Sequence, residues 1–467
     1  MSEPDFDFIV IGGGSAGYSG AAQAAKLGLK TAVIEGGRDV GGLCILRGCM
    51  PSKTLLESGH RAEAIRGAGE FGLRAEYFGA DGAAIRARKR RLIGEFADYR
   101  RQQLEGGAFE FIRGEAAFVD AHSIDVRLLD GSLRRLSARA FLSATGSRVQ
   151  WREIPGLRET GFWTSDEVLD ADHIPASVVV LGGGAIALEA ASYYAGLGSR
   201  VTVIQRSAQV LKETDEDVAT ALTEALEHRG IEIFRGTALL RAERVGEVKR
   251  VHFTHAGAER FAEGEEIIYA LGREPALENL ELARAGVALE RGAIAADAHQ
   301  RCGPEHLFAA GDVCGPFEVV HLAILQAELA ARNAARLLQR LDGQLEEIDY
   351  RLALFAVFTH PQVAAVGLTE RDARLKHDAI AAKYFFADHG KSMVRGETAG
   401  FVKLIAERES KRLLGASCIG PEAAELIHEI VVAMHFGATA HDLNRIPHYH
   451  PTLSEIWTYP ADELAAR

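Results

Sequence analysis

The sequence predicts an α/β protein with two Rossmann-like dinucleotide-binding domains, followed by a C-terminal α+β domain. The first observation is an internal repeat, because residues 8–35 align without a gap onto residues 178–205. Each copy reads as an apolar strand, a glycine turn, a small-residue helix and a second apolar strand. The second observation is a change of pattern from about Asp349. There, alternating strands such as "GFVKLIAE" precede the helical segment "PEAAELIHEIVVAMHF".

Composition narrows the class of protein. The 467 residues are 47% hydrophobic, and 65 acidic against 53 basic residues give a net charge of -12. This balance is typical of a soluble globular protein and argues against nucleic acid as the main partner. No apolar run is long enough to span a bilayer and no targeting signal is recognisable, so we expect a cytoplasmic protein. Five cysteines in so long a chain do not make a disulfide framework.

Both glycine turns have the form that holds a pyrophosphate. The first glycine permits the tight bend, the second lets the ligand approach the backbone, and the third position lets helix and strand pack closely. The N-terminus of the following helix offers N–H groups and the positive end of its dipole to the phosphates. The residues at these positions are Gly12, Gly14 and Gly17 in the first copy, and Gly182, Gly184 and Ala187 in the second.

The last residue of the repeat differs between the copies. In the first copy the second strand ends at Glu35, which can accept hydrogen bonds from the adenosine ribose of FAD or NAD. In the second copy this position is Gln205, followed by Arg206 and then by Lys212. A neutral amide with two nearby cations suits a ribose that carries a 2'-phosphate, through charge-assisted hydrogen bonds of about 1.5–3 kcal/mol. The second site therefore favours NADPH; the alternative is that both cations are solvated loop charges.

The secondary structure of two further segments can be predicted. Residues 80–105 predict a helix with a strongly basic face, which we interpret as solvated or substrate-facing rather than as a reader of nucleic acid. Residues 307–315, "LFAAGDVCG", predict an apolar strand that ends near Gly311 and Asp312. A carboxylate at the carboxyl end of such a strand can meet a ligand hydroxyl.

Cys44 and Cys49 lie five residues apart in "GGLCILRGCMPSK". A helix is predicted to start at Cys49, with Pro51 in its first turn. The helix dipole there favours the thiolate and lowers the pKa of the Cys49 thiol, and Lys53 adds positive charge one turn on. A zinc site would need two more ligands, and no second Cys or His pair lies near. A structural disulfide is disfavoured by the helix-cap position, so we interpret the pair as a redox-active disulfide.

A second candidate for catalysis stands near the C-terminus, in "RIPHYHPTLSEIW". Pro451 restricts the backbone of His450, and Glu455 follows where a helix has begun. A carboxylate that binds an imidazole keeps it in one tautomer and suits it to acid–base catalysis. The alternative is a cap histidine with a surface glutamate. His448 is interpreted as structural rather than catalytic.

The cysteine loop, the two dinucleotide folds, "AGD" and "HPTLSE" together resemble the pyridine nucleotide-disulfide oxidoreductase family over essentially the whole chain. The resemblance implies an enzyme with FAD and NADP or NAD as cofactors, and a homodimer whose active site is shared between subunits. It also implies a domain order: an FAD-binding domain (1–150), an NAD(P)-binding domain (151–272), a second part of the FAD-binding or central domain (273–346) and a dimerisation domain (347–467).

The resemblance also assigns roles to residues. Cys49 would be the flavin-proximal thiolate and Cys44 the thiol that exchanges with substrate, while His450 and Glu455 of one subunit complete the site at Cys44 of the other. The expected FAD-binding residues are Gly12, Gly14, Gly17, Glu35, Gly42, Lys53, Ala116, Gly146 and Asp312. The expected NAD(P)-binding residues are Gly182, Gly184, Ala187, Glu189, Gln205, Arg206, Lys212 and Gly272, with Glu189 paired to Lys53. No metal ligands are expected.

Within the family, "PSK" and "HPTLSE" are most similar to dihydrolipoamide dehydrogenases, which implies a small disulfide, a dithiol or a lipoyl protein as substrate. Mercuric reductases carry a vicinal cysteine pair near the C-terminus, which "WTYPADELAAR" lacks, and Ser52 stands where glutathione reductases usually have lysine. Leu46 and Arg47 depart from the dihydrolipoamide dehydrogenase pattern. An NADPH-dependent small-disulfide or mercuric-ion reductase, and a redox-responsive binding subunit of a multienzyme assembly, remain alternatives. The direction of electron flow is not fixed by these residues.

Overall fold

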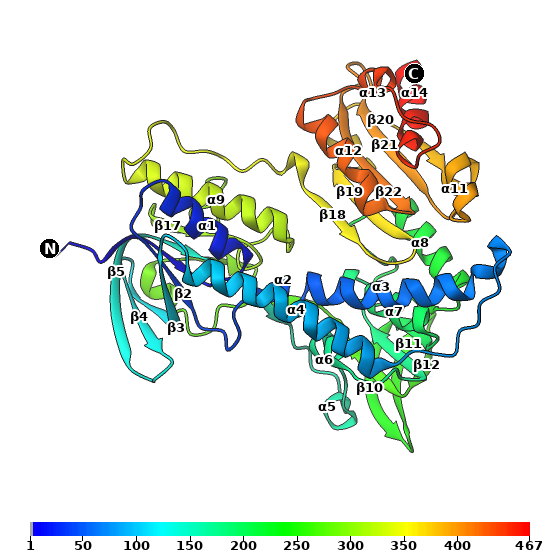
Figure 1. Cartoon of the computed structure of the whole chain (residues 1–467), viewed down its shortest axis with the longest axis horizontal. Helices are drawn as coiled ribbons and strands as arrows, with labels where there is room; N and C mark the ends of the chain where they lie inside the picture. Colours follow the sequence, from blue (N-terminus) through cyan, green and yellow to red (C-terminus); the bar gives the residue numbers. More distant parts are fainter. Residues whose placement is uncertain (1–2) are drawn as a thin grey trace. The chain divides into compact units, whose positions relative to one another are not determined.

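The computed structural model describes residues 3–467, which divide into two compact units. Unit 1 contains residues 3–52, 88–150 and 272–348, and unit 2 contains residues 53–87, 151–271 and 349–467. The division passes through two long helices, α3 (Cys49–Arg66) and α4 (Gly82–Glu105), whose segments are labelled in Figure 1.

Six strands of unit 1 form one sheet. Five strands are parallel, in the order β3-β2-β1-β5-β17, and the long strands β3 and β5 continue into an antiparallel ladder with β4 between them. The bounds are β1 (Phe6–Ile11), β2 (Thr31–Glu35), β3 (Glu110–Asp120), β4 (Ser123–Leu128), β5 (Leu133–Ser143) and β17 (Leu307–Ala309). Two short ladders add β6 (Ser147–Val149) with β14 (Arg273–Pro275) and β15 (Leu289–Glu290) with β16 (Ala293–Ile294).

Helices α1 (Ser15–Lys26) and α9 (Val320–Leu337) lie side by side (Figure 1). Their facing surfaces carry small residues, and a Cβ added to Gly20 would lie 3.3 Å from the Cβ of Ala327. Phe8 and Val10 of β1 are fully buried in the same core. Because the chain turns directly from β1 into α1, this core fixes the N-terminus of α1 at the carboxyl end of the sheet. The short helices of this unit are α2 (Gly42–Arg47) and η2 (Leu282–Ala285).

Unit 2 begins with a second parallel sheet, in the order β13-β7-β8-β9, beside a three-stranded antiparallel meander β10-β11-β12. Helix α7 (Ala185–Leu197) is apolar around most of its circumference and is largely buried, as expected for a helix packed on more than one side. The strands are β7 (Ser177–Leu181), β8 (Arg200–Ile204), β9 (Glu232–Phe234), β10 (Ala238–Val245), β11 (Val248–His255), β12 (Ala258–Gly264) and β13 (Glu266–Tyr269). The other helices are η1 (Ala68–Phe71), α5 (Leu157–Thr160), α6 (Ser165–Asp170) and α8 (Glu216–His228).

The C-terminal part of unit 2 is an antiparallel sheet with helices around it. The strand order is β18-β19-β22-β21-β20, and Trp457 is fully buried in its core. The strands are β18 (Leu354–Val357), β19 (Gln362–Gly367), β20 (Ala379–Phe385), β21 (Phe401–Glu407) and β22 (Leu413–Gly420). The helices are η3 (Tyr350–Leu352), α10 (Glu370–Lys376), η4 (Phe386–Asp388), α11 (Gly390–Arg395), α12 (Ala423–His435), α13 (Ala440–Arg445), η5 (Ser454–Trp457) and α14 (Thr458–Ala466).

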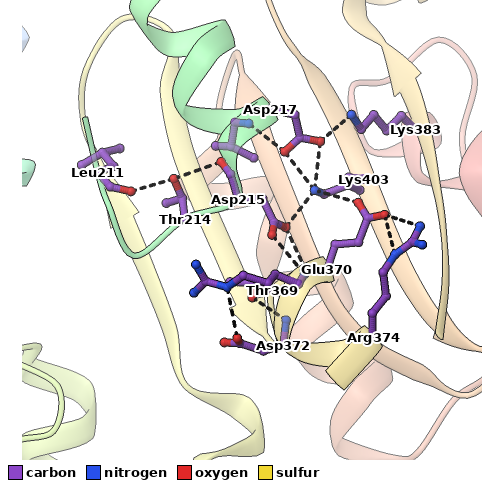
Figure 2. Close-up of polar contacts among 12 residues, drawn as sticks. Leu211, Thr214, Asp215, Asp217, Thr369, Glu370, Asp372, Arg374, Lys383 and Lys403 are labelled. Atoms are coloured by element: carbon purple, nitrogen blue, oxygen red, sulfur yellow. Dashed lines mark hydrogen bonds and ion pairs between the residues drawn. The ribbon is translucent and has the colours of Figure 1, made fainter. Parts of the chain in front are cut away.

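A buried charged cluster joins the start of α8 to strand β21 within unit 2 (Figure 2). The side chain of Lys403 is 0% exposed, and its Nζ lies 2.8 Å from Asp215 Oδ2 and 3.0 Å from both carboxylate oxygens of Asp217. Glu370 Oε2 is 3.4 Å from the same nitrogen. Asp215 also accepts a hydrogen bond from the backbone N–H of Glu370. Asp215 thus links the loop before α8 to both α10 and β21.

The predicted fold class is confirmed, because two parallel βαβ folds and a C-terminal α+β region are all present. The segments predicted as a basic helix, as the strand "GFVKLIAE" and as the helix after it correspond to α4, β21 and α12. Over residues 3–467, no helix combines the length and the apolar character that crossing a membrane requires.

Candidate active site

The cysteine pair lies where helix α2 gives way to helix α3. Cys44 is inside α2, Cys49 is the first residue of α3, and the two cysteines approach to near 3 Å. A Cβ at Gly48 would lie 3.0 Å from the carbonyl oxygen of Leu43, so only glycine lets the two helices meet without a shift. The hydroxyl of Ser52 donates to the carbonyl oxygen of Cys49, at 3.1 Å. The expected helix start at Cys49 is therefore present.

Gly42, at the start of α2, packs against the first glycine turn. A Cβ on Gly42 would lie 2.5 Å from the Cα of Gly14, and Gly42 has a φ of +71°. The two glycines allow backbone to touch backbone at this point. The helix that carries Cys44 consequently starts in contact with the turn predicted to hold a pyrophosphate.

Arg100 of α4 is a neighbour of Cys44 that the sequence did not reveal. Its guanidinium carbon lies 4.2 Å from the centre of the Tyr18 ring, a cation–π distance. Burial lowers the pKa of Arg100, and the nearby Tyr18 and Cys44 act in the opposite direction. Among the described residues, its Nε and Nη1 are buried without a hydrogen-bond acceptor. A cation in this environment would gain from an anionic partner.

The first glycine turn has the shape of a dinucleotide cradle. Gly12 has a φ of +107°, and a Cβ there would lie 2.4 Å from the carbonyl oxygen of Ala144. A Cβ on Gly17 would meet the carbonyl oxygen of Gly12 at 1.7 Å. No side chain caps the N-terminus of α1. The backbone of this turn is packed so closely that only glycine fits at these two positions, and the N-terminus of α1 carries no side-chain cap, which fits a bound pyrophosphate.

Glu35 reaches over this turn from the end of β2. Its Oε2 accepts a hydrogen bond from the backbone N–H of Gly13 at 2.8 Å, and its Oε1 accepts from Gly37 at 2.6 Å. Arg113 on β3 donates from Nη2 to the carbonyl oxygen of Gly37, at 2.5 Å, and so holds the following loop. Glu35 therefore lies at the end of β2 beside the first glycine turn, and its binding to the adenosine ribose stays a prediction.

The second glycine turn accommodates a larger residue than the first at its third position. Gly182 has a φ of +119°, and a Cβ there would lie 2.3 Å from the carbonyl oxygen of Ala270. The side chain of Ala187, however, is accommodated, with its Cβ 3.6 Å from the position a Gly182 Cβ would take. Nothing lies within 4 Å of a Cβ built on Gly184, and no side chain caps α7. These features also fit a pyrophosphate.

The residues expected to bind the ribose at the second nucleotide site lie around this turn. The amide of Gln205 donates to the carbonyl oxygen of Gln209 at 3.2 Å, and its side chain lies 2.9 Å from a Cβ position on Gly183. Arg206 is exposed, and Lys212 is 66% exposed with Glu213 at 3.4 Å. Both cations are therefore on the surface of the same loop as Gln205.

Asp312 lies after β17 and is held by residues from two other segments of unit 1. The Ser147 hydroxyl donates to Asp312 Oδ2 at 2.6 Å, and Arg273 Nε donates to the Ser147 hydroxyl oxygen at 2.8 Å. Burial and the charge of Asp312 raise the pKa of the nearby Glu318. Ser147, Arg273 and Glu318 carried no motif that could have indicated them.

The remaining predicted FAD contacts are placed as follows. Ala116 lies on β3 in the hydrophobic core, with 8% of its surface exposed. Gly146 follows β5 with a φ of +71°, and its carbonyl oxygen accepts from the N–H of Ala276. Gly272, expected at the second nucleotide site, falls in unit 1, where its carbonyl oxygen accepts from Gln150. The other expected nucleotide residues of the second site all lie in unit 2.

Lys53 and Glu189 form the ion pair that the resemblance implied. Lys53 Nζ is 2.9 Å from both carboxylate oxygens, and the two side chains are 33% and 10% exposed. Phe358 completes the arrangement: its N–H donates to Glu189 Oε1 at 3.0 Å and its ring centre lies 4.6 Å from Lys53 Nζ. Phe358 was not indicated by the sequence.

His450 and Glu455 also meet. His450 Nδ1 lies 2.9 Å from Glu455 Oε2, and their side chains are 78% and 12% exposed. With the proton on Nδ1, the exposed Nε2 is left as the proton acceptor. His448 instead contacts Glu429 at 2.6 Å and the Ile446 carbonyl oxygen at 2.9 Å, contacts that suit a structural residue.

The other cysteines are set in the cores. Cys302 and Cys418 are 1% and 0% exposed, and burial raises the pKa of both thiols. Burial also raises the pKa of Cys314 to about 12. These three thiols are unsuited to nucleophilic chemistry at neutral pH. Over residues 3–467, no three His, Cys, Asp or Glu side chains converge in a way that could hold a metal ion.

Comparison with known proteins decides the family. The family model described as pyridine nucleotide-disulphide oxidoreductase matches residues 6–327, and the model of its dimerisation domain matches residues 355–461. The chain belongs to the pyridine nucleotide-disulphide oxidoreductase family. It is accordingly a flavoprotein oxidoreductase that binds FAD and a nicotinamide dinucleotide, as the sequence predicted.

Members of this family match the chain over nearly its whole length. A dihydrolipoyl dehydrogenase of Chlamydia muridarum is 34% identical, over 98% of this chain and 96% of its own. A mercuric reductase of Bacillus cereus is also 34% identical, over 97% of this chain and 70% of its own. Among solved structures, the Cu(II) complex of the HOCl-induced flavoprotein disulfide reductase RclA from Escherichia coli has a TM-score of 0.86 at 26% identity, covering 99% of this chain and 100% of that one.

Proposed function

We propose that this family member is a homodimeric dithiol–disulfide oxidoreductase that passes electrons between NAD(P)H and a disulfide substrate through Cys44 and Cys49. The observation that carries the proposal is the packing of Gly42 on Gly14, because it sets the helix of Cys44 directly on the first dinucleotide turn. FAD, when bound, supplies the two-electron chemistry that connects the nicotinamide with the cysteine pair. The cradle around Gly12 and Gly17, with Glu35, would hold its adenosine and pyrophosphate.

The chain's own residues then carry the exchange with substrate. The Cys44 thiolate attacks one sulfur of the substrate disulfide, which forms a mixed disulfide and releases the first substrate thiolate. His450, which has taken the proton of the Cys44 thiol at Nε2, gives that proton to the released thiolate. The Cys49 thiolate next attacks the Cys44 sulfur, so the internal disulfide closes and the second substrate sulfur leaves as a thiolate, which takes a proton from the solvent. Two substrate thiols are formed for each internal disulfide, and oxidation of a dithiol is the reverse.

The sharing of the site between subunits is part of the proposal. The match to the family's dimerisation domain supports a homodimer, and His450 with Glu455 lies inside that matched segment. His450 is exposed on the single chain, as a residue that serves the Cys44 of a partner subunit would be. The predicted domain boundaries at 150, 272 and 346 belong to the same proposal.

For the substrate we propose a lipoyl group or a similar small disulfide. The similarity to the Chlamydia muridarum dihydrolipoyl dehydrogenase and the motifs "PSK" and "HPTLSE" support it. For the nicotinamide we propose a preference for NADPH, supported by Gln205, Arg206 and Lys212 on one surface loop. A soft metal ion is the second candidate substrate, since the mercuric reductase of Bacillus cereus is equally similar.

The deciding experiment replaces Cys44 with serine. Cys44→Ser is expected to keep bound FAD and its reduction by NADPH, while lipoamide reduction falls by at least about 1,000-fold, because a serine hydroxyl is not a comparable nucleophile at neutral pH. Cys418→Ala, which removes a buried thiol outside the proposed site, is the matched control. Turnover of lipoamide by Cys44→Ser at the parent rate would remove Cys44 from the reaction. It would favour a binding subunit whose turnover is incidental.

A further inference from the structure

A second histidine lies behind Glu455. His389 follows the 3-10 helix η4, and its side chain is 0% exposed. Its Nε2 lies 3.5 Å from Glu455 Oε1, whereas His450 contacts the other oxygen, Oε2. The carboxylate is therefore flanked by two imidazoles, one buried and one exposed.

The far side of His389 is also occupied. Its Nδ1 lies 2.9 Å from the hydroxyl oxygen of Ser392, which is itself 0% exposed. The ring is enclosed by aromatic groups, with the Tyr459 and Phe386 ring centres at 6.3 and 6.5 Å. The four residues thus form a continuous series from buried hydroxyl to exposed base: Ser392, His389, Glu455 and His450.

With a neutral His389, only one arrangement of protons satisfies this series. Glu455, when ionised, can only accept, so a lone pair on His389 Nε2 would face a lone pair on Oε1. The proton of His389 must then be on Nε2, and Nδ1 accepts from the Ser392 hydroxyl. The 3.5 Å separation is long for a hydrogen bond, and Nε2 has no other partner among the described residues. A modest movement of Glu455 would close this gap and use the buried donor.

His389 is suited to this task because its surroundings favour the neutral imidazole. Burial lowers the pKa of His389, and the nearby Glu455 carboxylate offsets that effect only in part, while His450 adds to it. The other ionisable group facing the ring is Tyr459 of α14, which stacks on Tyr384 of β20. A neutral His389 can orient the Glu455 carboxylate by a hydrogen bond without placing a second positive charge beside it. The negative charge of Glu455 then still acts on His450.

We propose that His389 is a positioning residue for the acid–base pair, which holds Glu455 through Oε1 so that Oε2 keeps His450 in the tautomer with a reactive Nε2. The inference rests on the proposed function, since it assigns His450 to proton transfer. It adds a buried residue to the site that neither the motif around His450 nor the family resemblance indicated.

The test compares two replacements. His389→Phe keeps a planar ring and loses the donor, whereas His389→Gln supplies an amide donor that can reach Glu455. His389→Phe is expected to lower lipoamide kcat about 3- to 10-fold, the effect of losing one hydrogen bond. The pH midpoint of its rate profile is expected to fall, because a Glu455 that is no longer held against His450 stabilises the protonated imidazole less. His389→Gln should recover most of the rate and restore the midpoint, and His441→Gln, an exposed histidine elsewhere in unit 2, is the control.

A measurement that does not depend on turnover separates this inference from the proposed function. The titration midpoint of His450 is followed by NMR in the full protein labelled with 15N in its histidine side chains, with the signal assigned through His450→Gln. A downward shift of the midpoint in His389→Phe supports the positioning role even if lipoamide is not the substrate. An unchanged midpoint, or equal losses in His389→Phe and His389→Gln, would show that His389 only fills space.

Discussion

Lys53 Nζ lies 2.9 Å from each of the two carboxylate oxygens of Glu189. This ion pair joins the first turns of α3 to the first turns of α7. Glu189 is only 10% exposed, and its Oε1 also accepts from the N–H of Phe358. Glu189→Gln removes the charge that balances Lys53. Because Lys53 is about one-third exposed, we expect a loss of stability of roughly 1–2 kcal/mol, below the range for fully buried pairs.

Thermal unfolding of the FAD-bound protein measures this loss as a lower midpoint. Glu57→Gln is the control, since Glu57 pairs with Arg61 on the exposed surface of the same helix. Its effect should be within about 0.5 kcal/mol. Equal midpoints for the two variants would contradict a stabilising role for the Lys53–Glu189 pair.

The two glycine turns should respond differently to a methyl group. A Cβ on Gly17 would lie 1.7 Å from the carbonyl oxygen of Gly12, whereas the second turn already contains Ala187. Gly17→Ala is expected to abolish FAD retention, since α1 must move away from β1 to admit the methyl group. Ala187→Gly should change NADPH affinity by less than about 5-fold, through helix flexibility alone. The FAD content of the purified proteins, read by absorbance, checks the first expectation; full occupancy in Gly17→Ala would refute it.

Lys403 is expected to stabilise the C-terminal region strongly. It is fully buried between Asp215, Asp217 and Glu370 (Figure 2). Removing one partner of a buried ion pair costs about 3–5 kcal/mol because the remaining charges are uncompensated. Lys403→Met should therefore lower the unfolding midpoint far more than Lys383→Met, whose lysine is 35% exposed and forms an ion pair with Asp217. Similar midpoints for both would contradict this account.

The same cluster predicts the direction of a pH effect on stability. Burial acts to raise the pKa of Asp217, but hydrogen bonds from Lys383 and Lys403 outweigh it and hold that pKa below its ordinary value of 3.8. A lowered carboxyl pKa stabilises the folded state above pH 3.8 and loses that effect as the pH falls through the folded value. Unfolding midpoints measured from pH 6 to pH 3 should fall less steeply in Asp217→Asn than in the parent below pH 4. Parallel curves would exclude the contribution of Asp217.

The pKa of Lys403 is shifted in the opposite sense. Burial lowers it, and the hydrogen bonds that Lys403 donates to Asp215 and Asp217 more than compensate, so that it lies above the ordinary 10.5. Its stabilising effect is complete below pH 10.5 and is lost only at higher pH. The cluster therefore contributes fully at neutral pH.

Cofactor preference can be tested on the loop after β8. If Arg206 and Lys212 bind a 2'-phosphate, Arg206→Ser with Lys212→Ser should lower kcat/KM for NADPH by about 10- to 100-fold, as expected for losing two charge-assisted hydrogen bonds. The value for NADH should change by less than about 3-fold. A matched pair of surface charges, Arg371→Ser with Arg374→Ser, is the control. Better kcat/KM with NADH than with NADPH in the parent enzyme would exclude the proposed preference.

Much of the fold could be predicted because its signals are local. The glycine turns of residues 12–17 and 182–187 and the apolar strands beside them impose one conformation on a short segment, whatever surrounds it. The start of α3 at Cys49 and the approach of His450 to Glu455 also involve residues close in sequence. The burial of Lys403 could not be predicted from the sequence, because a charged residue in a strand is ordinarily expected at the surface.

By itself, the sequence determined the two dinucleotide folds, the cysteine pair and the histidine–glutamate pair, because each depends on spacing along a few residues. The tertiary structure alone decided that Ser147 and Arg273 support Asp312, that Phe358 binds Glu189, and that His389 lies behind Glu455. These contacts join segments far apart in the chain. Strand order and helix packing bring such segments together, and neither leaves a periodic signal in the residues concerned.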